Sequence, residues 1–147
     1  MDDFSKNEGF IWFDGELIDW KDAKVHVLTH GLHYASSVFE GERCYDGKIF
    51  REIEHTERLH HSANTLGFNI PFSIDEICKI RKLVLDSNKI RDGYIRPVAW
   101  RGSEMMGISA QKNTIHLAVA AWEWPSYYSP EARLKGIKLD LSKWRRP

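Results

Sequence analysis

Residues 10–19 read Phe-Ile-Trp-Phe-Asp-Gly-Glu-Leu-Ile-Asp, two short strand-like runs joined by Asp14-Gly15. Asp and Gly tolerate the positive φ angles of a type I′ turn, so this pair is typical of a tight β-hairpin. A second pair, Asp46-Gly47, separates an expected strand over residues 34–45 from a partner over residues 48–51. The chain is therefore expected to begin with two antiparallel hairpins.

Two amphipathic helices are expected after the hairpins. Residues 55–66 have apolar side chains at helical spacing and end at Gly67, which suits a helix C-cap. Residues 73–88 begin with Ser73 and Glu76, at the spacing of a capping box, and continue with apolar residues in an i, i+3, i+4, i+7 pattern.

Strands are expected again over residues 94–100 and 114–122. The order of strands, helices and strands predicts an α+β fold with a mainly antiparallel sheet and helices packed on it. We assign residues 1–122 to this N-terminal domain. Residues 123–135, with two prolines among aromatic residues, are expected to form an ordered connector. Residues 136–147 alternate like the first strand of a second, truncated domain.

The composition excludes several classes of protein. The chain has 147 residues, 42% of them hydrophobic and 29% charged, which is typical of a globular domain. Its 21 basic and 21 acidic side chains give no net charge, so neither nucleic acid nor a membrane surface is an expected partner. There is no signal-peptide pattern and no apolar run near the roughly 20 residues that span a bilayer. We therefore expect a cytoplasmic protein, with Cys44 and Cys78 as reduced core residues.

The strand that begins at Tyr94 carries a candidate binding group. At a spacing of two residues, Arg96 shares one face with Tyr94 and Trp100. If that face is buried, Arg96 needs a carboxylate or phosphate partner, because an unpaired buried charge is costly. If the face is exposed, Arg96 is only solvated. Pro97 removes one ladder donor, so the strand is expected to be an edge strand or an interrupted one.

The longer strand of the second hairpin has a similar arrangement. Phe39, Gly41 and Arg43 alternate onto one face. Glu40 and Glu42 fall on the opposite face. Gly41 either leaves space for another group to approach closely or marks a β-bulge.

Arg58 lies near the start of the first expected helix, where a guanidinium beside free backbone N–H groups suits a phosphate clamp. The nearby histidines His55, His60 and His61 do not share one helical face, so no metal site is expected. Neither a glycine-rich phosphate loop nor a Walker lysine motif occurs. The residues alone therefore indicate a domain that offers arginine and aromatic side chains to an anionic small molecule.

Together these stretches resemble the N-terminal domain of branched-chain amino acid aminotransferases, in the fold-type IV group of pyridoxal-phosphate enzymes. The similarity extends over nearly the whole chain and consists of several short motifs in the family's order. They are Trp12-Phe13-Asp14-Gly15-Glu16, His30-Gly31-Leu32-His33-Tyr34, Val38-Phe39-Glu40-Gly41-Glu42-Arg43-Cys44-Tyr45, Glu54-His55 with Arg58-Leu59, Ser62-Ala63, Tyr94-Ile95-Arg96-Pro97 and Met106-Gly107.

The resemblance implies a role for each candidate residue. Arg58 would bind the phosphate of pyridoxal 5′-phosphate, and Tyr94 and Arg96 would bind the carboxylate end of the substrate. A loop that reaches into the neighbouring subunit's site implies a homodimer or a higher homo-oligomer. The remaining matches are Tyr34, Phe39, Trp124 and Tyr127 as walls of the aliphatic side-chain pocket, Arg43 near that pocket, and Met106 and Gly107 in the loop.

The implied reaction is the pyridoxal-phosphate-dependent transfer of the amino group of leucine, isoleucine or valine to 2-oxoglutarate. The lysine that holds the cofactor covalently in the family aligns beyond Pro147, and none of Lys135, Lys138 and Lys143 matches it. We therefore expect no catalytic residue in this sequence and no activity from the chain alone.

Two other interpretations remain open. A related fold-type IV enzyme, such as a D-amino acid aminotransferase or an aminodeoxychorismate lyase, shares the scaffold, although residues 39–43 and 94–97 resemble the branched-chain group more closely. Alternatively, the chain is a non-catalytic binding or dimerisation module left by gene truncation, which a stop codon after Pro147 would support.

Overall fold

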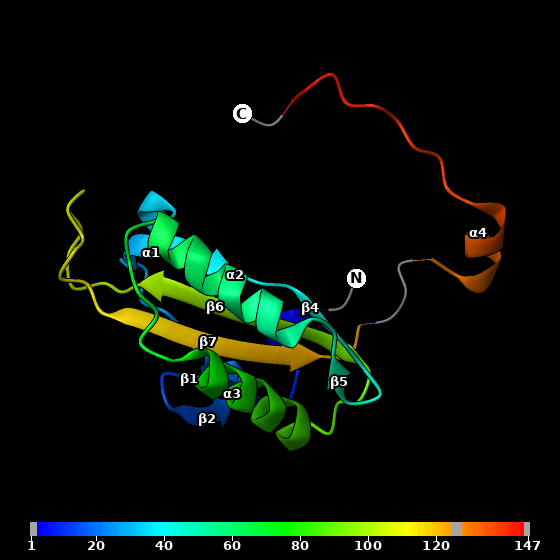
Figure 1. Ribbon diagram of the computed structural model, residues 1–147, viewed down its shortest axis with the longest axis horizontal. Coiled ribbons are helices and arrows are strands. Elements are labelled where there is room, and N and C mark those ends of the chain that lie inside the picture. Colours follow the sequence, from blue (N-terminus) through cyan, green and yellow to red (C-terminus); the bar gives the residue numbers. More distant parts are fainter. Residues whose placement is uncertain (1–2, 125–127, 146–147) are drawn as a thin grey trace.

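The computed structural model describes residues 3–124 and 128–145 (Figure 1). Seven strands and four α-helices lie within those residues, together with two short 3-10 turns at Phe4–Lys6 and Trp20–Asp22. The elements are β1 (Phe10–Phe13), β2 (Glu16–Asp19), α1 (His30–Tyr34), β3 (Ser37–Phe39), β4 (Glu42–Tyr45), β5 (Lys48–Ile49), α2 (Glu52–Thr65), α3 (Ile74–Ser87), β6 (Gly93–Arg101), β7 (Ile115–Trp122) and α4 (Pro130–Lys135).

The strands form one sheet in the order β2-β1-β7-β6-β4-β5, and β3 also pairs with β6. All recorded pairings are antiparallel. Helices α2 and α3 cover one face of this sheet, whereas α4 lies apart from it (Figure 1). The predicted α+β fold with a mainly antiparallel sheet is therefore confirmed.

Both Asp-Gly hairpins are confirmed. Asp14 and Gly15 connect β1 to β2 with φ angles of 49° and 122°. Asp46 and Gly47 connect β4 to β5 with φ angles of 48° and 74°. A type I′ turn requires positive φ at both central residues, which Asp and Gly adopt at low cost. The second partner strand is shorter than expected, because β5 ends at Ile49.

The strand expected over residues 34–45 is wrong at its start and is divided in the middle. Tyr34 is the last residue of α1, and Ala35 caps that helix in the left-handed conformation, with φ 53°. Because such a residue turns the chain out of the helix, pairing with β6 begins only at Ser37. From there the expected alternation holds, with Glu40 and Glu42 buried.

Both long helices are confirmed with shifted bounds. The capping box of α3 is present, since the Ser73 hydroxyl accepts from the Glu76 N–H and the Glu76 carboxylate accepts from the Ser73 N–H. Helix α2 begins three residues earlier than expected, at Glu52, where acidic side chains in the first turn stabilise the free N–H groups.

The main core lies between the sheet and the helix pair. Leu59 of α2, Ile77 and Val84 of α3, and Ile95 and Leu117 of the central strands are all fully buried. Both cysteines are free, Cys44 buried and Cys78 half-buried. The opposite face of the sheet carries only a smaller apolar cluster, which leaves that face available for a site.

Residues 136–145 belong to no helix or strand in the described part of the chain. Their side chains are exposed, with Leu139 at 86% and Leu141 at 94%. A strand forms only against a partner, and residues 136–145 pair with none of the described strands. The assignment of residues 136–147 to a second domain stays a prediction. None of the helices in the described ranges is long and apolar enough to cross a membrane.

Candidate active site

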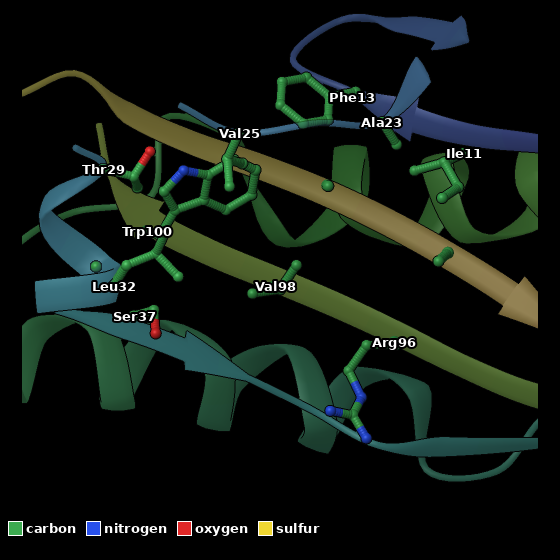
Figure 2. A pocket seen from close by; sticks show the side chains of 13 residues that line it. Ile11, Phe13, Ala23, Val25, Thr29, Leu32, Ser37, Arg96, Val98 and Trp100 are labelled. Carbon is green, nitrogen blue, oxygen red and sulfur yellow. The ribbon is translucent and has the colours of Figure 1, made fainter. Parts of the chain in front are cut away.

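The open face of the sheet contains an apolar pocket of about 320 Å³ (Figure 2). Side chains of β1, β3, β6 and β7, of α1 and of the segment before α1 line it. Figure 2 shows Trp100, Val98 and Arg96 in sequence along β6, with the Arg96 guanidinium directed toward the neighbouring strand. Among the described residues that line the pocket, Arg96 is the one with a charged side chain.

Arg96 is half-buried and has no carboxylate partner among the described residues. Its Nη2 donates to the Tyr94 hydroxyl at 2.9 Å, and its guanidinium carbon lies 4.2 Å from the centroid of the Phe39 ring. Its Nε is buried and has no hydrogen-bond acceptor in the part of the chain that the structure describes. A charge withdrawn from water without a counter-charge is costly, so this arrangement favours an anionic ligand. Within residues 3–124 and 128–145, the arginine is therefore neither ion-paired nor simply solvated.

Gly41 occupies the gap between β3 and β4, and the gap is not a bulge. Phe39 pairs with Val98 before it and Glu42 with Ile95 after it, so two residues face two across the gap. The space is taken by the Tyr94 hydroxyl, which would lie 1.9 Å from a Cβ at position 41. Of the two interpretations of Gly41, close approach of another group is thus confirmed.

Pro97 lies opposite the same gap. Strand β6 is central and not an edge strand, but its pairing with β3 and β4 is interrupted there. The Pro97 carbonyl accepts from the Glu40 N–H at 3.0 Å, but proline has no N–H with which to return a second ladder hydrogen bond. Strand β6 itself runs unbroken from Gly93 to Arg101 and pairs with β7 through Pro97, so the expectation of an edge or interrupted strand is wrong, and only the pairing with β3 and β4 is broken there.

Arg43 and the aromatic residues after β7 extend the same face. Arg43 Nη1 donates to the Trp124 carbonyl at 3.2 Å. The ring of Trp124 lies 4.8 Å from that of Tyr94, centroid to centroid. The structure therefore brings together Phe39, Arg43, Tyr94, Arg96 and Trp124. Tyr127 lies outside the described residues.

Arg58 extends from α2 to the helix-facing side of the same strand gap. Its Nε and Nη2 donate to the two carboxylate oxygens of Glu40, both at 2.7 Å. His55 Nδ1 lies 2.8 Å from Glu40 Oε2. Burial acts to raise the pKa of Glu40, but hydrogen bonds from Arg58 and His55 outweigh burial and leave this pKa below its usual range. Arg58 contacts Glu40 on the helix-facing side of the sheet, and Arg96 contacts the neighbouring residue Phe39 on the open face. The two arginines therefore contact adjacent residues from opposite faces of the sheet.

A second buried acid, Glu42, pairs with Arg81 of α3 at 2.7 Å, and both side chains are fully buried. Arg81 also donates to Thr56 of α2, so the pair joins β4 to both helices. Burial raises the pKa of Glu42 to about 7 in spite of the adjacent Arg81 charge. The sequence interpretation assigned no role to Glu40 or Glu42. Their positions in the alternating strand place both acids on the core-facing side, where a buried carboxylate needs a cationic partner, so an ion pair for each could have been predicted.

Tyr34, Met106 and Gly107 form a separate group beyond the Trp100 end of β6. The Tyr34 hydroxyl donates to the Met106 carbonyl at 3.1 Å, and His30 Nε2 lies 3.1 Å from the Gly107 carbonyl oxygen. Tyr34 is 47% exposed and stacks on His30. Within one chain, the structure does not bring this group to the Arg96 cluster.

Comparison with known proteins identifies similar sequences. A family model described as amino-transferase class IV matches residues 37–147. The chain is 47% identical over 140 residues to a probable branched-chain-amino-acid aminotransferase of Rickettsia bellii, covering 95% of this chain and 47% of that protein. It is 45% identical over 143 residues to the branched-chain-amino-acid aminotransferase of Pseudomonas aeruginosa, covering 95% and 47%.

Solved structures with the same arrangement include the branched-chain amino acid aminotransferase of Escherichia coli, with a TM-score of 0.80 and 41% identity. The T.th. branched-chain amino acid aminotransferase with pyridoxamine 5′-phosphate gives the same TM-score and identity. Each match covers 86% of this chain and 43% of the other. The chain spans about half the length of the curated relatives it matches.

Proposed function

Since the chain belongs to the class IV aminotransferase family, as its motifs predict, we propose that it forms the substrate-binding side of a transaminase site. The proposed reaction transfers the amino group of leucine, isoleucine or valine to 2-oxoglutarate. Relatives described as branched-chain aminotransferases support this substrate class. One solved relative holds pyridoxamine 5′-phosphate, which supports pyridoxal 5′-phosphate as the cofactor.

The observation that carries the proposal is the state of Arg96. Its guanidinium is half-buried, oriented by the Tyr94 hydroxyl and the Phe39 ring, and without a carboxylate partner among the described residues. Amino acid and 2-oxo acid substrates share a carboxylate, and a guanidinium binds a carboxylate through paired hydrogen bonds. The substrate would supply the counter-charge that the protein lacks.

Arg58 fits the phosphate of the cofactor. Its side chain is 63% exposed although Glu40 holds one edge of the guanidinium, so the remaining N–H groups can reach a bound phosphate. When bound, pyridoxal 5′-phosphate would supply an electron-accepting ring for proton transfer at the substrate α-carbon. The residues of this chain bind and orient. Arg96 and Tyr94 hold the carboxylate, and the rings of Phe39 and Trp124 exclude water. No proton transfer is assigned to the chain itself.

We also propose that the protein acts as a homodimer or a higher homo-oligomer in the cytoplasm. The resemblance of Met106 and Gly107 to the family's intersubunit loop supports this proposal, and Ile108 in the same loop is 90% exposed. Tyr34, which donates to Met106, would accompany that loop into a neighbouring site. Cross-linking and sedimentation of the complete protein would test the assembly.

The proposal is tested by the substrate dependence of the complete protein. We expect turnover of L-leucine and L-valine with 2-oxoglutarate and no turnover of D-alanine. Turnover of D-alanine instead would favour a D-amino acid aminotransferase. Arg96→Gln should raise KM for the acid substrates by roughly 10- to 100-fold, the value of a charged hydrogen bond. The control Arg133→Gln, on the exposed helix α4, should leave KM unchanged. An unchanged KM in Arg96→Gln would refute the assignment of Arg96.

A further inference from the structure

We propose that Glu40 is a positioning residue for Arg58: it holds one edge of the guanidinium so that the other edge meets the cofactor phosphate. This inference rests on the proposed function, in which Arg58 binds that phosphate. Glu40 itself touches neither cofactor nor substrate. Its effect would pass through Arg58 alone, which makes the two residues separable by experiment.

Glu40 is rigidly placed. Its N–H donates to the Pro97 carbonyl at 3.0 Å, in the gap between the end of β3 and the start of β4. Its side chain is 5% exposed, on the helix-facing side of the strand. The residues on either side, Phe39 and Gly41, are in contact with Arg96 and Tyr94 on the open face. The carboxylate is therefore fixed to the same stretch of backbone that forms the substrate side of the site.

The contact between Glu40 and Arg58 is bidentate. The Nε–Nη2 edge of the guanidinium donates to both carboxylate oxygens at 2.7 Å, and His55 supports Oε2 from the side at 2.8 Å. The planar guanidinium carries five N–H donors in a fixed geometry. Holding one edge leaves Nη1 directed away from Glu40, with no hydrogen-bond acceptor among the described residues, whereas Nη2 also lies 3.2 Å from His55 Nδ1.

Two effects of this contact on phosphate binding have opposite signs. The Glu40 carboxylate repels a phosphate electrostatically, so its removal would tighten binding if charge alone mattered. It also holds a long, exposed side chain in one orientation, so its removal would weaken binding because Arg58 must then be ordered by the ligand. Two parallel hydrogen bonds of 2.7 Å at a buried carboxylate favour the second effect. The sign of the change therefore distinguishes positioning from simple electrostatics.

The experiment compares binding of pyridoxal 5′-phosphate and of pyridoxal, which lacks the phosphate, to the complete protein by absorbance titration. We expect Glu40→Gln to weaken binding of pyridoxal 5′-phosphate about tenfold and to leave binding of pyridoxal unchanged. In an Arg58→Ala background, Glu40→Gln should have no further effect. The matched control is Glu54→Gln. This variant also removes a carboxylate paired with an arginine, Arg51, but at an exposed position of α2, the helix that carries Arg58.

The outcomes separate the two proposals. If Arg58→Ala binds pyridoxal 5′-phosphate as tightly as the unaltered protein, the proposed role of Arg58 in binding the phosphate is wrong. If Arg58→Ala weakens binding but Glu40→Gln leaves it unchanged or tightens it, the positioning role is wrong. Should Glu40→Gln fail to fold, Arg58→Lys provides the test, because lysine keeps the charge and cannot be held by one edge. Unchanged phosphate binding in Arg58→Lys would overturn the inference, and a tenfold loss would support it.

Discussion

Replacing Gly41 with alanine is expected to displace the Tyr94 hydroxyl and, with it, the Arg96 guanidinium. A Cβ at position 41 would lie 1.9 Å from Tyr94 Oη and 2.9 Å from Tyr94 Cζ. The φ angle of Gly41 is not in the left-handed region, so side-chain contact alone decides the effect. The hydroxyl would have to move by about 1.5 Å to reach an ordinary contact distance.

That movement is resisted from several sides. Arg96 donates to the hydroxyl at 2.9 Å, and the rings of Trp122 and Trp124 lie 5.1 and 4.8 Å from the Tyr94 ring. Overpacking of this kind typically costs about 1–3 kcal/mol. We therefore expect the free energy of unfolding to fall by roughly that amount in Gly41→Ala. KM for the carboxylate substrate of the complete protein should also rise, because Arg96 loses its support.

A double-mutant cycle makes the reasoning testable. In the Tyr94→Phe background, the nearest atom to the new methyl group is a ring carbon at 2.9 Å instead of the hydroxyl at 1.9 Å. Urea unfolding followed by tryptophan fluorescence should then show a cost of Gly41→Ala at least about 1 kcal/mol smaller than in the unaltered chain. Gly107→Ala, where no atom lies within 4 Å of the added Cβ, is the matched control. Equal costs of Gly41→Ala in both backgrounds would refute the role of the hydroxyl.

Three further predictions concern stability and the lysines. The Glu42 carboxyl holds its proton in the folded chain up to a pKa of about 7, whereas its usual pKa is 4.5, so its contribution to stability should fall as pH rises between these values. Urea unfolding across this range should show that slope, and Glu42→Gln should remove it. Ser73→Ala should lower the free energy of unfolding by about 1 kcal/mol through loss of the capping box, and an unchanged urea midpoint would contradict this. Borohydride reduction of the 147-residue chain with pyridoxal 5′-phosphate should label no specific lysine, and a stoichiometric label on Lys143 by mass spectrometry would contradict the sequence interpretation.

The features predictable from the sequence are those that local rules decide. The Asp-Gly turns need positive φ at two adjacent residues, and the Ser73–Glu76 capping box depends on residues three apart. Alternation also separated the two faces of the strand that includes Phe39 correctly, because period two is a property of any extended backbone. The start of that strand was wrong because Ala35 ends α1 in a left-handed conformation, which alanine rarely adopts and its sequence does not signal.

The pairings within the site could not be predicted, because they join residues distant in sequence. Glu40 and Arg58 are 18 residues apart, Glu42 and Arg81 are 39 apart, and Tyr34 and Met106 are 72 apart. Alternation shows which face a side chain occupies but not which helix covers that face. The need for glycine at position 41 was equally hidden. The register of pairing is the same on both sides of the gap, so no bulge requires a glycine, and it is the Tyr94 hydroxyl that occupies the space of a side chain there.

Although the chain has no net charge, acidic and basic side chains lie on opposite faces of the sheet around Gly41. Glu40 and Glu42 point to the helix side, where each binds an arginine from α2 or α3. Arg43 and Arg96 lie on the open face, and neither has a carboxylate partner among the described residues. Because side chains alternate, the acids that stabilise the fold are kept away from the cations that face the pocket. Within the described residues, the open face therefore keeps positive charge that no carboxylate pairs, although the whole chain is neutral, and this suits the anionic substrate proposed above.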